Sequence, residues 1–561
     1  TGILNTKVLT TNKLTLNNGA FDAKDVQVKT ATISGQLDVT SLRADTQAIL
    51  QNGVLTLKGR AEDNAHDIAG KVDVTGNGVI TTNKAAAAKI LAKRSDIESG
   101  SLLYVDRPVK LAEGSVLTIG GKAPVMRTPR LRLMRLATAA PSPASVNVAE
   151  GGLAVVDTAA FGDSDTVYEG ANLNVSEGEM LLTNVKTVRT MKLASSITGE
   201  NISTDNAFIG ANVDGGNVDL AYNEGAVADK TVDNRLKARY EAGLSDKEAF
   251  LLDSLDAPAY LEGDRLNAKG NAALEQITSG NATTGVLNVA YDANQQVSDA
   301  IVRHQLSEHN GKGLWADVFY AKNEAKEIYG HSGYSADIYG GVIGVDGTFS
   351  CGATGGIALT VGTADADSKG GVFSTSLDSD FWGVSAYAVK PMGDFHVKAD
   401  LGYLHFDNDL TGLGDASDAS TVTVGLRADY TAFQKGAFSI TPHAGIRYTH
   451  IDTDAVAFND DQKMNIVETP VGVTFAGNFE TTGWTIVPSY DFTIVPQLAD
   501  KEVEAFGSAD DMKILNGGLY NNVLGVQAQK GNVSFGLHAA YGFGSNERSN
   551  TQVNANVRYN F

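Results

Sequence analysis

The sequence predicts an all-β protein in which a right-handed parallel β-helix is followed by a short helical junction and a 12-stranded transmembrane β-barrel with a helix in its lumen. Short alternating strands recur through the first part, and long two-faced strands fill the last part. Aromatic usage separates these parts: residues 1–312 hold no Trp and six of the 18 Tyr, whereas residues 313–561 hold all three Trp. We therefore expect the two parts to face different solvents.

Composition excludes several classes of protein. The net charge of -21 argues against a nucleic-acid partner, because phosphate binding needs clustered Lys and Arg. The single cysteine, Cys351, cannot form an internal disulfide, and no run of 18 apolar residues predicts a transmembrane helix. The chain begins at Thr1 within a repeat, and we interpret it as a processed or truncated piece of a longer exported protein.

Residues 1–233 are predicted to form the β-helix. Early strand centres follow one another at eleven or twelve residues, as in 14–16, 26–28 and 37–39, with Asn, Gly or Asp between them. Such units bury their apolar residues only by stacking on their neighbours. A β-sandwich fits less well because tight hairpins with long partner strands are scarce.

Two stretches interrupt the repeats. Residues 85–94 (AAAAKILAKR) predict a short helix. The Pro-flanked stretch 124–143 carries Arg127, Arg130, Arg132 and Arg135. These arginines either bind an anionic glycan or host surface or face water in a loop, and we favour the solvated loop.

One motif in this part is similar to a catalytic site. Gly162-Asp163-Ser164-Asp165 is similar to the nucleophile motifs Gly-Asp-Ser-Gly of exported proteases and Gly-Asp-Ser-Leu of esterases, but Asp165 replaces the fourth residue in both. That substitution places a carboxylate where negative charge must be stabilised. His66 is the only histidine before His304. We therefore expect a turn between strands and no enzyme site.

Residues 234–292 are predicted to be a helical junction. Ser245 and Glu248 form a capping box ahead of an apolar stripe of Phe250, Leu251 and Leu255. A second helix covers 272–277 and ends at Gly280. Residues 293–310 form a third helix that is polar nearly all round, which suits a hydrated lumen better than a core. Its predicted plug residues are Gln296, Val297, Asp299, Ile301 and Glu308.

From residue 311 to 561, apolar and polar residues alternate in about twelve segments, most of them with an aromatic residue at one or both ends. In the last strand Val553, Ala555, Val557, Tyr559 and Phe561 share the apolar face. Charges on the opposite faces predict a water-lined lumen, because lipid excludes them. The predicted lumen-facing residues are Asp317, Lys398, Asp400, Arg427, Asp429, His443, Arg447, Asp491 and Arg558.

Several ordered motifs in residues 234–561 carry a family resemblance. They are Ala272-Ala273-Leu274-Glu275-Gln276, Gly313-Leu314-Trp315-Ala316-Asp317, Tyr339-Gly340-Gly341-Val342-Ile343-Gly344-Val345-Asp346, Thr441-Pro442-His443-Ala444-Gly445-Ile446-Arg447-Tyr448 and Tyr559-Asn560-Phe561. This region resembles the C-terminal region of classical, monomeric autotransporters of Gram-negative bacteria.

The resemblance implies a location and partners. A monomeric barrel would sit in the outer-membrane lipid bilayer, reached with periplasmic chaperones and the barrel assembly machinery, which would read Val557, Tyr559 and Phe561. The β-helix would be a passenger exposed at the cell surface, with a possible host or cell-surface ligand. The resemblance implies no cofactor, metal or catalytic residue.

Three functions compete at this point. The first is a transporter that anchors and displays a non-enzymatic passenger, an adhesin or surface-interaction stalk. In the second, sequence upstream of this fragment carries a protease or esterase domain. In the third, the barrel is a porin-like channel, which is disfavoured because porins lack a solenoid and a preceding plug helix. We favour the first.

The resemblance also yields a prediction about self-cleavage. Some family members release the passenger inside the barrel by attack of an asparagine side chain at an Asn-Asn pair, and the corresponding region here reads Gln295-Gln296-Val297. Glutamine does not readily close the same five-membered ring, so we expect the passenger to stay attached. Mass spectrometry of the barrel checks this: a fragment beginning between Asn294 and Asp299 would contradict it.

Overall fold

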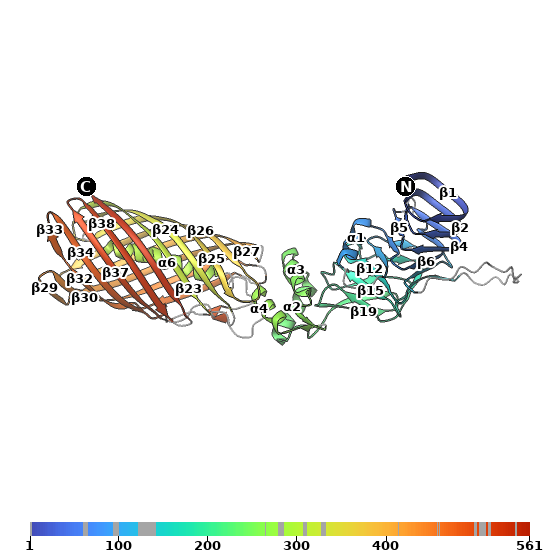
Figure 1. Ribbon diagram of the computed structural model, residues 1–561. Helices are drawn as coiled ribbons and strands as arrows, with labels where there is room; N and C mark the ends of the chain where they lie inside the picture. The colour runs from blue at the N-terminus through green and yellow to red at the C-terminus, as the bar shows by residue number, and fades with distance from the viewer. Residues whose placement is uncertain are drawn as a thin grey trace. The chain divides into compact units, whose positions relative to one another are not determined.

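The computed structural model describes residues 3–59, 65–93, 100–121, 142–263, 265–278, 285–306, 311–326, 332–412, 415–456, 458, 461–498, 502–503, 512–513, 518–544 and 547–561 (Figure 1). The basic stretch with Arg127, Arg130, Arg132 and Arg135, the predicted helix end at Gly280 and the plug residue Glu308 lie outside these ranges. The chain forms two compact units, 1–226 with 236–245 and 227–235 with 246–561.

The first unit is a stack of parallel strands, as predicted. One path of the sheet runs outward from β2 through β3, β5, β7, β8, β12, β15 and β18, and the other runs through β4, β6, β10, β11, β14 and β17. The strands of the stack are β1 (Ile3–Leu16), β2 (Ala20–Ile33), β3 (Gln36–Val39), β4 (Ser41–Gln51), β5 (Val54–Leu57), β6 (Ile68–Thr75), β7 (Val79–Thr81), β8 (Ser101–Val105), β9 (Val109–Lys110), β10 (Val116–Ile119), β11 (Ala144–Val148), β12 (Gly152–Asp157), β13 (Tyr168–Glu169), β14 (Ala171–Asn174), β15 (Glu179–Thr183), β17 (Ile197–Thr198) and β18 (Ile202–Thr204).

Apolar side chains in the stack repeat at the same register from strand to strand. Ile33 lies beside Leu50, Leu50 beside Val74, Val74 beside Ile119 and Ile119 beside Val148, and all five are buried. Parallel strands put equivalent residues directly above one another, so each turn buries its apolar residues against the next. The short alternating strands of the sequence are therefore the rungs of one continuous core.

The parallel pattern ends before residue 233. Strands β16 (Arg189–Lys192), β19 (Ile209–Asp214) and β20 (Asn217–Tyr222) pair antiparallel in the order β16-β20-β19. This antiparallel sheet lies within residues 1–233, which were predicted to be β-helix throughout, so that part of the prediction was wrong. The short helix predicted at 85–94 is present as α1 (Lys84–Lys93).

The junction contains α2 (Lys230–Ala242), α3 (Asp246–Asp253), the two-stranded sheet of β21 (Leu261–Glu262) and β22 (Arg265–Leu266), and α4 (Ala268–Thr278). The capping-box position agrees with the start of α3, but the predicted apolar stripe was wrong in one member. Phe250 is 73% exposed, whereas Leu251, Leu252 and Leu255 are buried. The buried face of α3 therefore lies one residue away from the predicted one.

The last part is a closed antiparallel ring. In the described residues its order runs from β28 back to β23, then β39, β38, β37, β34, β32 and β30, and β30 pairs with β28 to close it. Pro470 separates β31 from β32, and both pair with β30, so they act as one interrupted strand of a 12-strand barrel. The bounds are β23 (Lys312–Ala325), β24 (Ser332–Thr348), β25 (Thr354–Gly370), β26 (Ser376–Met392), β27 (Phe395–Thr411), β28 (Asp415–Tyr430), β29 (Phe433–Lys435), β30 (Phe438–Thr453), β31 (Gln462–Glu468), β32 (Val471–Gly477), β33 (Phe479–Thr481), β34 (Trp484–Val495), β35 (Glu502–Val503), β36 (Met512–Lys513), β37 (Leu519–Lys530), β38 (Val533–Gly544) and β39 (Ser549–Asn560).

The two faces of this ring differ as the alternation predicts. Outward residues such as Ile357, Leu359 and Val361 on β25 are large, apolar and exposed. Inward residues on the same wall, such as Ala358 and Thr360, are buried. A barrel in water would hide its apolar face, so this arrangement suits a lipid environment.

A long helix, α6 (Val286–Leu306), lies among the barrel strands (Figure 1). It begins seven residues before the predicted start at 293, because the apolar residues Val286, Leu287, Val289 and Ala290 extend the buried face. Among the described residues, no helix is both long enough and apolar enough to cross a membrane.

Candidate functional site

The lumen helix α6 and the barrel wall around it form the candidate functional site. Sixteen of the 21 residues of α6 are buried, and the helix packs against β23 to β28 and β30. Val297 and Ile301, both predicted plug residues, join a core that continues into the wall. We expected the helix to be surrounded by lumen water. This was wrong, because most of its side chains are buried against the inner wall, which supplies partners for many of the polar ones.

Asn294 occupies the middle of the helix and binds the wall by its side-chain amide. Its Oδ1 accepts hydrogen bonds from the hydroxyls of Thr423 at 2.9 Å and Thr421 at 3.2 Å, and its Nδ2 donates to Thr449 Oγ1 at 3.4 Å. Those threonines lie on β28 and β30, so Asn294 joins the helix to one side of the ring.

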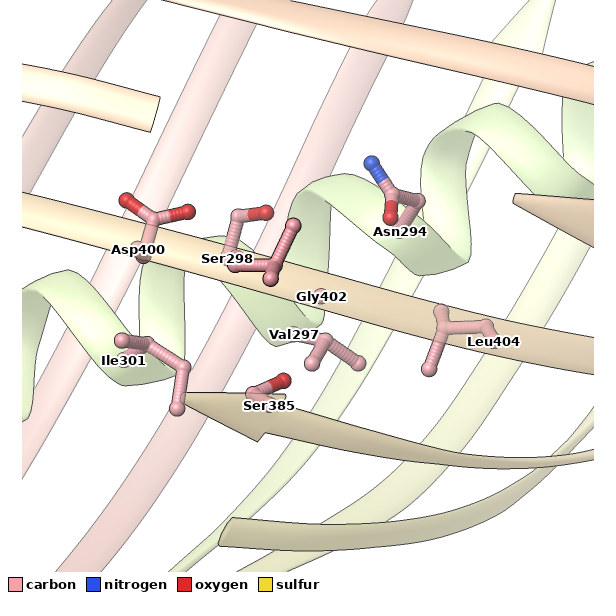
Figure 2. A pocket seen from close by; sticks show the side chains of 9 residues that line it. Asn294, Val297, Ser298, Ile301, Ser385, Asp400, Gly402 and Leu404 are labelled. Carbon is pink, nitrogen blue, oxygen red and sulfur yellow. The ribbon is translucent and has the colours of Figure 1, made fainter. Parts of the chain in front are cut away.

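Figure 2 shows residues that line the neighbouring cavity, among them Asn294 and Ser298 of the helix and Asp400 of the wall. The cavity measures about 10 Å³, close to the minimum that holds one water molecule. The predicted lumen residue Asp400 thus lines the helix–wall boundary. Gln296 is fully buried, and its amide has no hydrogen-bond partner among the described residues.

An ion pair joins the predicted plug residue Asp299 to the predicted lumen residue Arg447. Arg447 Nη2 lies 3.7 Å from Asp299 Oδ1. Nearby, Gln295 Nε2 donates to both oxygens of Glu468, at 2.7 and 2.8 Å, and Glu468 also accepts from the Tyr291 hydroxyl. Glu468 and Tyr291 were not among the predicted site residues, since neither lies within a recognised motif.

A denser cluster surrounds His304 near the end of the helix. His304 Nε2 lies 2.6 Å from Asp346 Oδ2, and its ring stacks on Trp315 with centroids 4.0 Å apart. The predicted lumen residue Arg558 donates two hydrogen bonds to Asp346, at 2.6 and 2.7 Å. Asp346 also accepts from Tyr387 at 3.2 Å. The cluster therefore joins α6, β23, β24, β26 and β39.

Two further ion pairs connect the helix to the wall. Arg303 Nη2 lies 3.2 Å from Asp317 Oδ1, and Asp317 is one of the predicted lumen residues. At the other end of the helix, Arg548 Nη2 lies 3.1 Å from Asp292 Oδ1. All four side chains are mostly or fully buried.

The remaining predicted lumen charges pair with one another across the wall. Asp429 forms ion pairs with Lys398 and with Arg427, the latter at 2.7 Å. His443 Nε2 lies 2.8 Å from Asp491 Oδ2. Because Lys398, Asp429 and His443 are buried, mutual pairing accommodates these charges, and the expected contact with lumen water was wrong for them.

Glycines in the recognised motifs make room for inward side chains. Gly344 of β24 lies opposite Trp315, and a Cβ at residue 344 would meet the Trp315 ring, with Nε1 only 2.5 Å away. Gly313 has the Arg558 guanidinium over the place where a Cβ would be. Gly313, Gly344 and Asp346 all lie in the motifs named above, so the sequence marked these positions. The sequence did not show which side chains pack against them or bind them, because those partners lie on other strands.

The predicted assembly residues lie on the outer face of the last strand. Val557, Tyr559 and Phe561 are all exposed, and Phe561 is 69% exposed. The rings of Tyr559 and Phe561 are 5.8 Å apart. The three side chains therefore present one apolar surface to the surroundings of the barrel.

One group in the described residues has metal-like spacing. His405, Asp407 and Asp418 place possible ligand atoms within 4.8 Å of one another on adjacent strands β27 and β28. Their outward position and the exposure of both carboxylates give no enclosed coordination sphere, so we assign no metal to them.

Comparison with protein families decides the identity of the barrel. The family described as "Autotransporter beta-domain" matches residues 314–558. The C-terminal domain of this chain is an autotransporter beta-domain. This barrel therefore lies in the outer membrane, and the parallel stack that precedes it in the chain is consistent with a passenger exposed at the cell surface.

Solved structures with similarity to this chain include three barrel domains. The translocator domain of NalP from Neisseria meningitidis is 14% identical, with 50% of this chain and 99% of that chain covered and a TM-score of 0.41. The transport unit of AIDA-I from Escherichia coli is 13% identical, with the same coverages and TM-score. The beta domain of the Bordetella autotransporter Brka is 16% identical, covering 45% and 100%, with a TM-score of 0.35. No curated protein sequence matches the chain.

A double-mutant cycle tests the contribution of the central ion pair. We expect Arg447→Ala and Asp299→Ala each to lower the free energy of barrel unfolding by about 1 kcal/mol, since Arg447 and Asp299 are only partly screened by water. The double variant should cost no more than either single one. The measurement is the temperature at which each variant unfolds on a semi-native gel. If the effects of the two single variants add up in the double variant, the two side chains do not interact.

Proposed function

We propose that this autotransporter secretes and then permanently displays its own β-helical passenger, and that the passenger is a non-enzymatic adhesin or surface-interaction stalk. The barrel assembly machinery recognises the strand that ends at Phe561, and periplasmic chaperones deliver the chain to it. The observation that carries the proposal is α6: a helix of the chain that leads from the passenger occupies the barrel lumen.

The contacts of α6 support permanent display. The helix is held by ion pairs at Asp292, Asp299 and Arg303 and by the hydrogen bonds of Asn294. A buried ion pair that loses one partner leaves an uncompensated charge, which typically costs about 3–5 kcal/mol. Withdrawing the helix would expose several such groups together, so the passenger stays anchored after transport.

The passenger surface supports a binding role over catalysis. Within Gly162–Asp165, the Asp165 carboxylate accepts a hydrogen bond from the Gly162 backbone N–H at 2.8 Å, which closes a turn. Asp165 is therefore engaged in local structure beside exposed Ser164. What the stack presents instead is a long series of rungs with solvent-exposed outward residues.

The terminal aromatic residue provides a test of secretion. We expect Phe561→Ser to abolish barrel assembly and passenger display, because it removes the end of the apolar surface that the assembly machinery would bind. Phe535→Ser is the matched control: Phe535 is an outward aromatic on the neighbouring strand β38, and its partner Val557 lies on β39. Surface labelling of the passenger on intact cells is the measurement. Equal display of both variants would contradict the proposed recognition.

Adhesion is tested separately on cells that display the passenger. Non-adherent Gram-negative cells carrying the full chain should bind immobilised host-cell surfaces several-fold better than cells carrying residues 227–561 alone, because only the full chain presents the stack. The density of displayed passenger is measured in parallel. If the passenger of the full chain is displayed and the two strains still bind equally, the adhesin role is contradicted.

A further inference from the structure

Two buried arginines lie at opposite ends of the closing strand β39. Arg548 directly precedes the strand, Arg558 is two residues from its end, and their side chains are 8% and 3% exposed. β39 pairs with β23 on one side and β38 on the other, so the β23–β39 pairing joins the first and last strands of the barrel. We call this pairing the seam.

At one end of the seam, Arg548 reaches the helix. Its Nη2 donates to Asp292 Oδ1 at 3.1 Å, and its guanidinium lies 5.2 Å from the centroid of the Tyr291 ring. The other oxygen of Asp292 accepts a hydrogen bond from Tyr334 of β24. Asp292 of α6 thus connects the start of β39 to the second strand of the barrel.

At the other end of the seam, Arg558 and the helix share one acceptor. Arg558 grips both oxygens of Asp346, and His304 of α6 contacts the same carboxylate at 2.6 Å. The His304 ring stacks on Trp315 of β23. The helix therefore touches both strands of the seam as well as β24.

The outer face of β39 cannot set the register of the seam by itself. Val553, Ala555, Val557 and Tyr559 repeat with period two, so a shift by two residues keeps apolar side chains facing lipid. The same shift moves each residue by about 7 Å along the strand. That displacement would separate Arg548 from Asp292 and Arg558 from Asp346, and would leave buried charges without partners.

We propose that α6 is an internal template for the seam, and that Arg548 and Arg558 are positioning residues through which the seated helix holds β39 in register against β23. Closure of the ring and seating of the helix are then one cooperative event. This inference concerns the assembly of the barrel and is independent of what the passenger binds.

Disulfide trapping of the seam tests the template. In a Cys351→Ser background, Val318 and Ala555 are replaced by cysteine as an in-register pair, since they lie directly opposite on the outer face. Cysteines at Val318 and Val553, or at Val318 and Val557, report a shift by two residues. Residues directly opposite lie within bonding reach, whereas diagonal neighbours do not. The full chain is expressed in cells, and the oxidised pairs are quantified in outer membranes.

The helix variant Asp292→Asn/His304→Ala should raise the ratio of shifted to in-register disulfide about tenfold, equivalent to losing about 1.4 kcal/mol of register preference. Asn294→Ala is the control. It removes hydrogen bonds of the same helix to β28 and β30, away from the seam, and should leave the ratio unchanged. An unchanged ratio in the first variant, or an equal rise in the control, would overturn the proposal.

If Asp292→Asn/His304→Ala does not assemble, Asp292→Asn/Arg548→Gln takes its place. This pair removes both charges together, so no buried charge is left alone and the barrel is expected to assemble with poor register. Normal register in this variant would also overturn the proposal. Passenger display on the same cells separates the two hypotheses, because loss of display with a normal seam argues against the proposed secretion and leaves the template intact.

Discussion

The hydrogen-bonded pairing of β39 with β23 is the contact on which the barrel depends. A sheet in lipid cannot leave backbone N–H and C=O groups at a free edge, because each unpaired group costs several kcal/mol there. The ring is complete only when its first and last strands meet, and the described residues pair from Gly313–Asn560 to Glu324–Ser549. Outer-membrane anchoring and the confinement of α6 both follow from that closure.

Once the ring is closed, a charge buried in the lumen without a partner would strongly destabilise the barrel. Inward charges that a porin would leave in water are instead matched in the lumen: Arg303 with Asp317, Arg558 with Asp346 and Lys398 with Asp429. Several matches include the helix. The plug is therefore part of the folded barrel, and its contacts are as specific as those of a protein core.

The N-terminal stack is stabilised differently, by burial of apolar side chains between successive turns. Its parallel strands stack rung on rung, and each apolar column is buried by the next turn. The antiparallel sheet β16-β20-β19 follows the last parallel rungs at the C-terminal side of the stack. Such a stack buries apolar area turn by turn as it folds.

The sequence by itself determined the architecture, because apolar alternation is a local property: the period-two strands, the stacked rungs and the existence of a polar helix before residue 312 all follow from it. Tertiary structure decided the partners. The cluster around Asp346 takes His304 from the helix, Trp315 from the first barrel strand and Arg558 from the last. Only closure of the ring brings Arg558 to the other residues. Alternation shows which face of a strand a residue lies on, but it does not show which residue of the neighbouring strand lies opposite. The register, the charge pairs and the start of α6 at Val286 depend on contacts between distant parts of the chain.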